Sequence, residues 1–132
     1  MHFKLDSLQR TLKNVGGQPF VRTPSVWLSP NNSAPHVRFS TNVNWNAGID
    51  SANGGLSLNQ WYYLAYTLSD PEKRLDFYID GQWVGFQSIQ KVQAEYVIFN
   101  DGPLYIGKDF DSTSVGMTGQ IRYGWLIQEC RN

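Results

Sequence analysis

The densest group of residues that could hold a sugar lies in one short stretch of the chain. Asn44, Trp45 and Asn46 come shortly after Asn42 and precede a predicted loop. Sugar rings present apolar C–H faces and outward hydroxyls, so a site pairs a flat aromatic face with fixed amides or carboxylates. We therefore predict that a glycan site includes Asn44, Trp45 and Asn46. The alternative, that Trp45 is a core anchor, stays open.

Trp83 is a second candidate platform for a sugar ring. It is the second residue after the pair Asp80-Gly81, which is typical of a tight turn. Its ring could face a ligand, or it could pack against Tyr78 or Phe86 across a hairpin. Both interpretations stay open.

Catalytic groups are not arranged for hydrolysis in this sequence. A glycosidase needs two carboxylic acids at a set separation, and the three glutamates, Glu72, Glu95 and Glu129, belong to no such pair. The two histidines, His2 and His36, have no nucleophile that the sequence places beside them. We therefore expect a protein that is not an enzyme.

Calcium is the metal that the loop residues could hold. Asp109, Asp111, Ser112 and Thr113 lie in one predicted loop, and Asp101 lies in the preceding one. Several loop oxygens of this kind can coordinate calcium. The alternative is that they are turn residues, chosen because their side chains bond to the nearby backbone.

Composition narrows the class of protein. The 132 residues, 41% of them hydrophobic, suit a single globular domain over 1–132. Eleven basic and eleven acidic residues give no net charge, which disfavours nucleic acid as a partner. Cys130 is the only cysteine, so the sequence allows no intrachain disulfide. We expect no membrane span, and no signal peptide at Met1–Asp6, which lacks a basic segment followed by an apolar run.

The elements that must position these residues read as short strands between turns. Trp61–Leu68 and Arg74–Ile79 flank a turn at 69–73, and Asp80-Gly81 joins the second run to Gln82–Phe86. Leu75, Phe77 and Ile79 alternate with polar or aromatic residues, a pattern typical of a half-buried strand. An Asp-Gly pair between two such runs is a strong hairpin signal because both residues tolerate positive φ. The sequence therefore predicts an antiparallel meander.

Weaker strands and the core complete the prediction. We expect further strands at 25–28, 36–40, 96–99, 104–108 and 120–127, with loops at 29–35, 45–55, 87–94, 100–103 and 109–118. Residues 7–14 could form a strand or a helical turn. The residues assigned to the core are Trp27, Trp61, Phe77, Ile79, Leu104 and Ile106.

Four motifs, in the same order and spacing, resemble laminin-G-like domains. Leu58–Thr67 is similar to their "W-(H/Y)-x-(V/L)-A-x-T" strand, and Arg74–Gly81 to their "L-x-(F/L)-Y-(V/I)-D-G" strand and turn. Pro103–Gly107 is similar to "(P/L)-L-x-I-G" and Gly119–Ile121 to "G-x-I". The resemblance covers about residues 56–127, and it implies an all-β, antiparallel jelly-roll sandwich of the concanavalin A-like superfamily.

The same resemblance sets further expectations. Glucanases of the superfamily carry an "E-x-D-x-x-E" strand that this chain lacks, which agrees with a non-catalytic role. Calcium is often held at a sandwich rim in such domains, and glycans on the concave sheet or rim loops. The usual first strand is absent or reduced to His2–Leu5, and an unpaired sheet edge would invite self-association.

We therefore expect a recognition module for carbohydrate or for a glycosylated or extracellular protein. The alternative is a structural or assembly subunit that makes only protein contacts, as a homo-oligomer or filament. The resemblance favours an extracellular location, and the residues themselves leave the compartment open. Asn31-Asn32-Ser33 matches the N-glycosylation pattern and matters only for a secreted chain.

Overall fold

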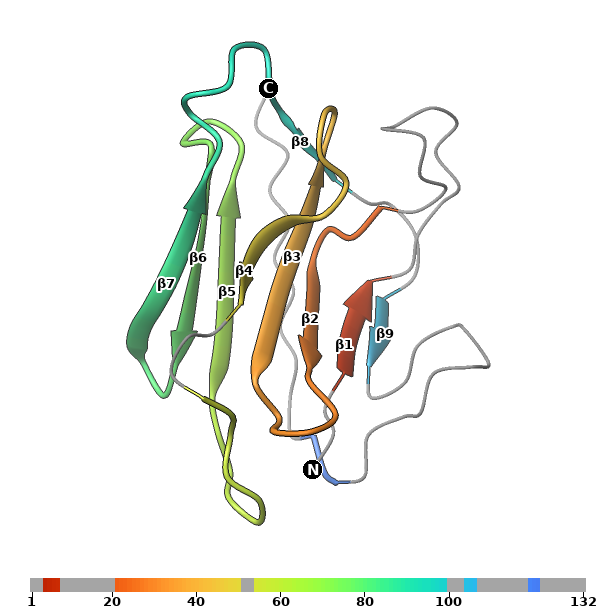
Figure 1. Ribbon diagram of the computed structural model, residues 1–132, viewed down its shortest axis with the longest axis vertical. Helices are drawn as coiled ribbons and strands as arrows, with labels where there is room; N and C mark the ends of the chain where they lie inside the picture. Colours follow the sequence, from red (N-terminus) through yellow and green to blue (C-terminus); the bar gives the residue numbers. More distant parts are fainter. Residues whose placement is uncertain (1–3, 8–20, 51–53, 100–103, 107–118, 122–132) are drawn as a thin grey trace.

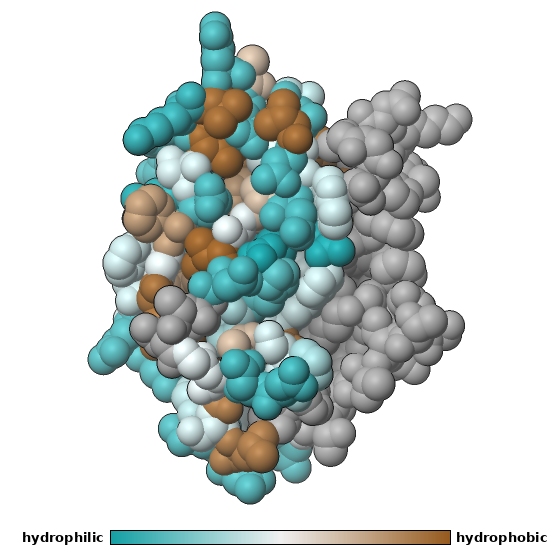
Figure 2. Space-filling model, viewed as in Figure 1, coloured by the Kyte–Doolittle hydropathy of each residue, from teal (hydrophilic) through white to brown (hydrophobic). Residues whose placement is uncertain are grey.

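Two antiparallel sheets lie face to face in this domain (Figure 1). The computed structural model describes residues 4–7, 21–50, 54–99, 104–106 and 119–121. Within these ranges all regular secondary structure is β-strand. Among the described residues on the side shown in Figure 2, apolar residues form small groups separated by polar ones. In the described part of the chain we find no helix whose length and hydropathy would let it cross a membrane.

The larger sheet runs in the order β4-β3-β2-β1-β9, and β8 pairs with β3 off this path. Its strands are β1 (Lys4–Ser7), β2 (Ser25–Leu28), β3 (Pro35–Thr41), β4 (Ala47–Asp50), β8 (Val97–Ile98) and β9 (Leu104–Ile106). β1 pairs with both β2 and β9, so a first strand is present, and it lies inside the sheet rather than leaving its neighbours unpaired. Self-association was expected because a first strand was thought to be missing, and this reason no longer holds.

The smaller sheet is the predicted meander, in the order β5-β6-β7. Its strands are β5 (Leu64–Ser69), β6 (Arg74–Ile79) and β7 (Gln82–Ser88). Asp80 and Gly81 have φ of 52° and 76°, the left-handed values that the two-residue hairpin needs. The predicted hairpin is confirmed at this turn.

A β-bulge interrupts the ladder between β6 and β7. Phe77 is opposite Gly85 and Tyr78 is opposite Trp83, so Val84 is an extra residue on β7. Both Val84 and Gly85 are directed toward the core: Val84 packs against the core cluster, and a Cβ at Gly85 would lie 3.2 Å from Cδ1 of Ile49. The bulge therefore changes which residues of β7 share a face.

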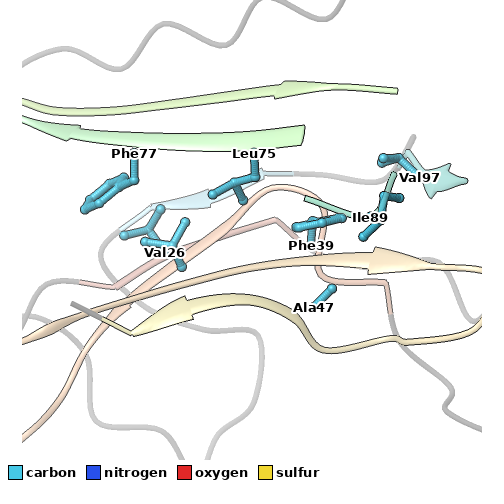
Figure 3. Close-up of a cluster of buried hydrophobic side chains, with 8 residues drawn as sticks. Val26, Phe39, Ala47, Leu75, Phe77, Ile89 and Val97 are labelled. Atoms are coloured by element: carbon cyan, nitrogen blue, oxygen red, sulfur yellow. The ribbon is translucent and has the colours of Figure 1, made fainter. Parts of the chain in front are cut away.

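The core fills the space between the sheets. Figure 3 shows Leu75 and Phe77 directed from the small sheet toward Val26 and Phe39 of the large one. The buried apolar cluster consists of Val26, Val37, Phe39, Ala47, Leu75, Phe77, Ile89 and Val97. Tyr66 also joins the sheets, because its hydroxyl donates a hydrogen bond to the carbonyl of Arg38 at 3.2 Å.

Three sequence predictions about elements are wrong in whole or in part. Residues 47–50 were expected in a loop but form β4, where Gly48 allows a close approach: a Cβ there would lie 1.9 Å from the carbonyl oxygen of Val37. A strand was expected from Trp61, but β5 begins at Leu64. Gln120 and Ile121 lie outside any strand, and the rest of the predicted strand 120–127 lies outside the described residues.

The core assignment of Trp61 is also wrong, because 59% of this residue is exposed. Leu64, Tyr66 and Leu68 pack against the core. In an extended chain side chains alternate between the two faces, so Trp61, three positions before Leu64, points away from the core. Phe77 is buried as predicted, and Ile79 packs against the cluster. The core assignment of Trp27 is wrong, because this residue is half-buried and lies outside the core cluster. The side chains of Leu104 and Ile106 lie outside the described part of the structure.

Candidate functional site

Trp45 and Trp83 lie on opposite outer surfaces of the sandwich. Trp83 occupies a ladder position whose side chain points away from the core, unlike the buried Phe77 beside it on the neighbouring strand. Trp45 shares a stacked group with Trp27, and Trp27 points away from the core because its neighbour Val26 points into it. The structure therefore does not join the predicted sugar-binding residues in one site.

The turn between β3 and β4 uses its asparagines locally. The Asn44 side-chain oxygen accepts a hydrogen bond from the backbone N–H of Asn46 at 2.9 Å. The Asn44 carbonyl accepts from the backbone N–H of Thr41 at 2.8 Å, and the Thr41 hydroxyl oxygen accepts from the backbone N–H of Asn44 at 2.9 Å. These bonds fix the turn, as asparagine commonly does. They leave the exposed Asn44 with its side-chain amide group for other contacts.

Arg22 lies between two tryptophans on this surface. Its guanidinium carbon is 4.2 Å from the ring centroid of Trp27 and 4.5 Å from that of Trp45. Its Nη1 donates to the side-chain oxygen of Asn46 at 3.2 Å. The arginine therefore covers part of the Trp45 ring and takes up the Asn46 acceptor, two of the groups that the sequence had suggested for a sugar.

The stacked group continues to His36, whose ring lies 5.4 Å from that of Trp27 at an angle of 14°. His36 Nδ1 bonds to the Asp50 carboxylate, which also accepts from Arg38 Nη2 at 2.8 Å. Burial and the Arg38 guanidinium lower the pKa of His36, and they outweigh the opposing effect of Asp50. Although burial opposes it, Arg38 lowers the pKa of the Asp50 carboxyl, with His36 adding to the effect.

Trp83 forms the centre of a different group on the outer face of the small sheet. Its indole Nε1 donates to the Asp76 carboxylate at 2.8 Å, and Arg74 donates to the same carboxylate through Nε and Nη2 at 2.8–3.0 Å. The hydrogen bonds from Arg74 are the main reason that the pKa of Asp76 is lowered, and Trp83 adds to the effect. Asp76 therefore remains an acceptor at neutral pH and fixes the indole ring.

Phe86 extends this aromatic surface. Its ring lies 5.9 Å from that of Trp83 at an angle of 22°, and the Arg74 guanidinium carbon is 4.1 Å from its centroid. Trp83 is 52% exposed and Phe86 is 45% exposed despite these contacts. The predicted packing of Trp83 against Phe86 is thus present, and it leaves about half of each side chain open to solvent. We call Arg74, Asp76, Trp83 and Phe86 the Trp83 platform.

A pocket of about 470 Å³ adjoins the platform. Phe86 and Arg74 belong to both, so platform and pocket are continuous. The other lining residues are Gln87, Ser88, Gln90 and Lys91. No sequence pattern indicated this pocket, because its walls come from the start of β6, the end of β7 and the loop that follows, and the bulge conceals the shared face of Trp83 and Phe86.

Five carboxylates in the described part of the chain serve local structure. Each of five accepts a hydrogen bond from a basic side chain, a hydroxyl, an indole or a backbone N–H: Asp50, Asp70, Asp76, Asp80 and Glu95. Within the same residues, no group of three or more His, Cys, Asp and Glu side chains could hold a metal ion. The predicted calcium ligands Asp101, Asp109 and Asp111 lie outside the described residues.

The sandwich and its two-sheet topology agree with the comparison with known families. A laminin G-type model of the concanavalin A-like lectin/glucanases superfamily matches residues 3–125. The chain belongs to this family. Comparison of this concanavalin A-like domain with curated proteins and with solved structures gives no match. Its family covers both lectins and glucanases, so the function must be argued from the side chains of this chain.

Proposed function

We propose that this concanavalin A-like domain is a non-catalytic module that binds carbohydrate on the Trp83 platform. The observation that carries the proposal is the fixed and exposed indole of Trp83, held by Asp76 and flanked by Phe86. An exposed tryptophan with an immobilised ring offers a C–H stacking surface with little loss of side-chain entropy on binding.

The polar groups around the platform suit sugar hydroxyls. Asp76 has carboxylate oxygens that accept hydrogen bonds, and Nη1 of Arg74 has no hydrogen-bond partner within the described residues. Both side chains are held by their mutual ion pair, so donors and acceptors are already in place before a ligand arrives. The proposal includes no catalytic step and no bound metal.

A glycan array probed with three variants tests this proposal. Trp83→Ala should raise the Kd by about fivefold or more, as expected for about 1–3 kcal/mol of aromatic stacking and area. Trp61→Ala is the matched control, since it removes a tryptophan of similar exposure that precedes β5. It should leave binding unchanged. Circular dichroism and thermal unfolding establish that each variant is folded.

The Trp45→Ala variant, as the third, separates the two predicted surfaces. The Asn44–Trp45–Asn46 turn stays a predicted second site, and loss of binding in Trp45→Ala with retention in Trp83→Ala would move the proposed site there. An array with no signal for the intact protein would reject carbohydrate binding altogether.

Protein–protein assembly is the second candidate function. Leu58, Trp61 and Tyr63 are 62%, 59% and 83% exposed and precede β5 along the chain. Large apolar or aromatic side chains that are exposed this close together favour a protein partner. Light scattering at increasing concentration tests self-association, with Leu58→Asp and Tyr63→Asp as variants that should weaken it. A clean monomer at high concentration would contradict this candidate as a homo-oligomer.

A further inference from the structure

We infer that the pocket beside the Trp83 platform takes the acidic group of a saccharide, so that the preferred ligand is an acidic rather than a neutral sugar. The inference rests on the proposed function, because it names the class of carbohydrate that the same site would select. The shared chemistry is an oxyanion on the sugar, either a carboxylate or a sulfate.

The charges that line the pocket point to this ligand. Its walls contain two cations, Arg74 and Lys91, and no carboxylate. The other polar lining residues are neutral: Gln87, Ser88 and Gln90. The chain as a whole has no net charge, so a pocket with this bias differs from the average surface.

The two cations differ in how far they are already neutralised. Arg74 forms an ion pair with Asp76 through Nε and Nη2, and Nη1 is its remaining terminal nitrogen. Lys91 has no ion-pair partner within the described residues. The ammonium of Lys91 is therefore the main charge offered to an anion, and Nη1 of Arg74 can add a directed donor.

The acceptors of the pocket limit which anion would fit. The Gln87 and Gln90 amide nitrogens donate to the backbone carbonyls of Ser88 and Glu72, at 3.1 and 2.9 Å. Both side chains thus keep an amide oxygen for the hydroxyls of a sugar. A pocket of about 470 Å³ is also larger than a lone inorganic anion needs and lies within the range of small-ligand sites. Cations, amide oxygens and an adjoining aromatic surface together suit a sugar that carries an acidic group.

The geometry also explains why the two parts act together. Phe86 lies in the pocket wall and stacks on Trp83, so a ring on the platform and a substituent in the pocket can belong to one saccharide. A neutral sugar would still stack on Trp83, with lower affinity. The acidic group therefore sets selectivity, and the platform supplies part of the affinity for either class.

Titration calorimetry with four probes tests the inference, in buffer with a chelator to exclude bridging by divalent cations. The probes are oligogalacturonate, the same oligosaccharide with its carboxyl groups reduced to alcohols, a sulfated dextran oligomer, and unsulfated dextran of the same length. We expect the charged member of at least one pair to bind about fivefold or more tightly than its neutral partner, and this preference to shrink in high salt. Whichever charged probe shows it identifies the carboxylate or the sulfate as the source.

Three variants locate the effect in the pocket. Lys91→Gln should lower the affinity for the acidic probe by about fivefold and leave the affinity for its neutral partner unchanged, since the substitution removes only a charge. Gln90→Glu should weaken the acidic probe further by adding repulsion. Gln60→Glu is the charge-matched control: Gln60 precedes β5 and Gln90 follows β7, so they lie at opposite ends of the small sheet (Figure 1).

The outcomes separate this inference from the proposed function. Equal binding of charged and neutral probes, with a loss in Trp83→Ala, would overturn the acidic preference and keep carbohydrate binding on the platform. No binding of any probe, together with an empty glycan array, would overturn both. An acidic preference that Gln60→Glu reduces as much as Gln90→Glu would assign the effect to overall charge and reject the pocket.

Discussion

The guanidinium of Arg22 lies over the indole of Trp45, 4.5 Å from its centroid, and the two residues are far apart along the chain. This contact attaches the segment before β2 to the turn between β3 and β4. Arg22 also donates to Asn46 in the same turn. The ring that the sequence suggested as a sugar platform therefore has a structural task of its own.

A double-mutant cycle measures that task. We expect Arg22→Ala and Trp45→Ala each to lower the free energy of unfolding, and the double variant to lower it by less than the sum. The coupling should be about 0.5–1 kcal/mol, as for cation–π pairs near a surface. Urea unfolding of the four proteins provides the measurement. Losses that simply add would show that the two side chains do not stabilise each other.

Phe77 and Trp61 should differ sharply in their effect on stability. Phe77 is 1% exposed and belongs to the core cluster, so Phe77→Ala should cost about 3–5 kcal/mol. Trp61→Ala should cost much less, because more than half of that side chain is already in solvent. Chemical denaturation of both variants is the test. Comparable losses would contradict the placement of Trp61 outside the core.

Stability should fall as the pH is lowered through the titration of His36. The pKa of His36 is lowered in the folded state, so below its ordinary value of about 6.5 the unfolded chain binds more protons than the folded one. The free energy of unfolding therefore declines from about pH 6.5 down to the lower folded pKa, and it is restored as the pH rises again. Asp50, whose pKa is also lowered, loses its contribution only in a more acidic range.

His36→Gln provides the comparison for this effect. Glutamine can still bond to Asp50 but does not titrate, so its thermal midpoint should change less than that of the native protein between pH 7.5 and pH 5. We would measure both midpoints by differential scanning fluorimetry in matched ionic strength. Parallel pH profiles for the two proteins would assign the slope to other groups.

The buried pair of Thr41 and Glu95 should be sensitive to loss of one partner. The Thr41 hydroxyl donates to Glu95 Oε1 at 2.5 Å, and both residues are buried. Thr41→Val keeps the shape but removes the hydroxyl, which donates to Glu95 and accepts from the backbone N–H of Asn44. The loss of both bonds should cost about 1–3 kcal/mol. Thr67→Val, at an exposed position of β5, is the control and should change stability by less than about 0.5 kcal/mol.

Local signals in the sequence predicted much of the fold. Asp80-Gly81 fixed the β6–β7 hairpin because the backbone conformation depends on those two residues alone. Strand β2 was also predicted with its observed bounds. A short apolar run without proline or glycine, flanked by turn residues, is a local pattern that the sequence itself shows. Strand β4 was missed because its short run lies among asparagines and glycines, and its pairing depends on the distant β3.

The candidate site was less predictable, for a physical reason. The sequence indicated Trp83 as a candidate sugar platform, but its partners Asp76 and Arg74 come from the neighbouring strand, and Lys91 from a loop. The contact between Arg22 and Trp45 could not be predicted, because nothing in the spacing of the two residues along the chain indicates it. Long-range neighbours of this kind follow from sheet register, which a single sequence does not specify.

The extra residue at Val84 has a consequence for how this surface tolerates a change in the length of the chain. In a regular strand, residues three apart such as Trp83 and Phe86 would point to opposite sides, yet here both are opposite outward-facing partners, Tyr78 and Asp76. Loss of the single codon for Val84 would leave the two rings two positions apart, so regular alternation would still hold both on the outer face, and only the contact of Val84 with the core would be lost. The hairpin thus contains a point where the chain can shorten by one residue during evolution while both rings of the platform keep their outward direction.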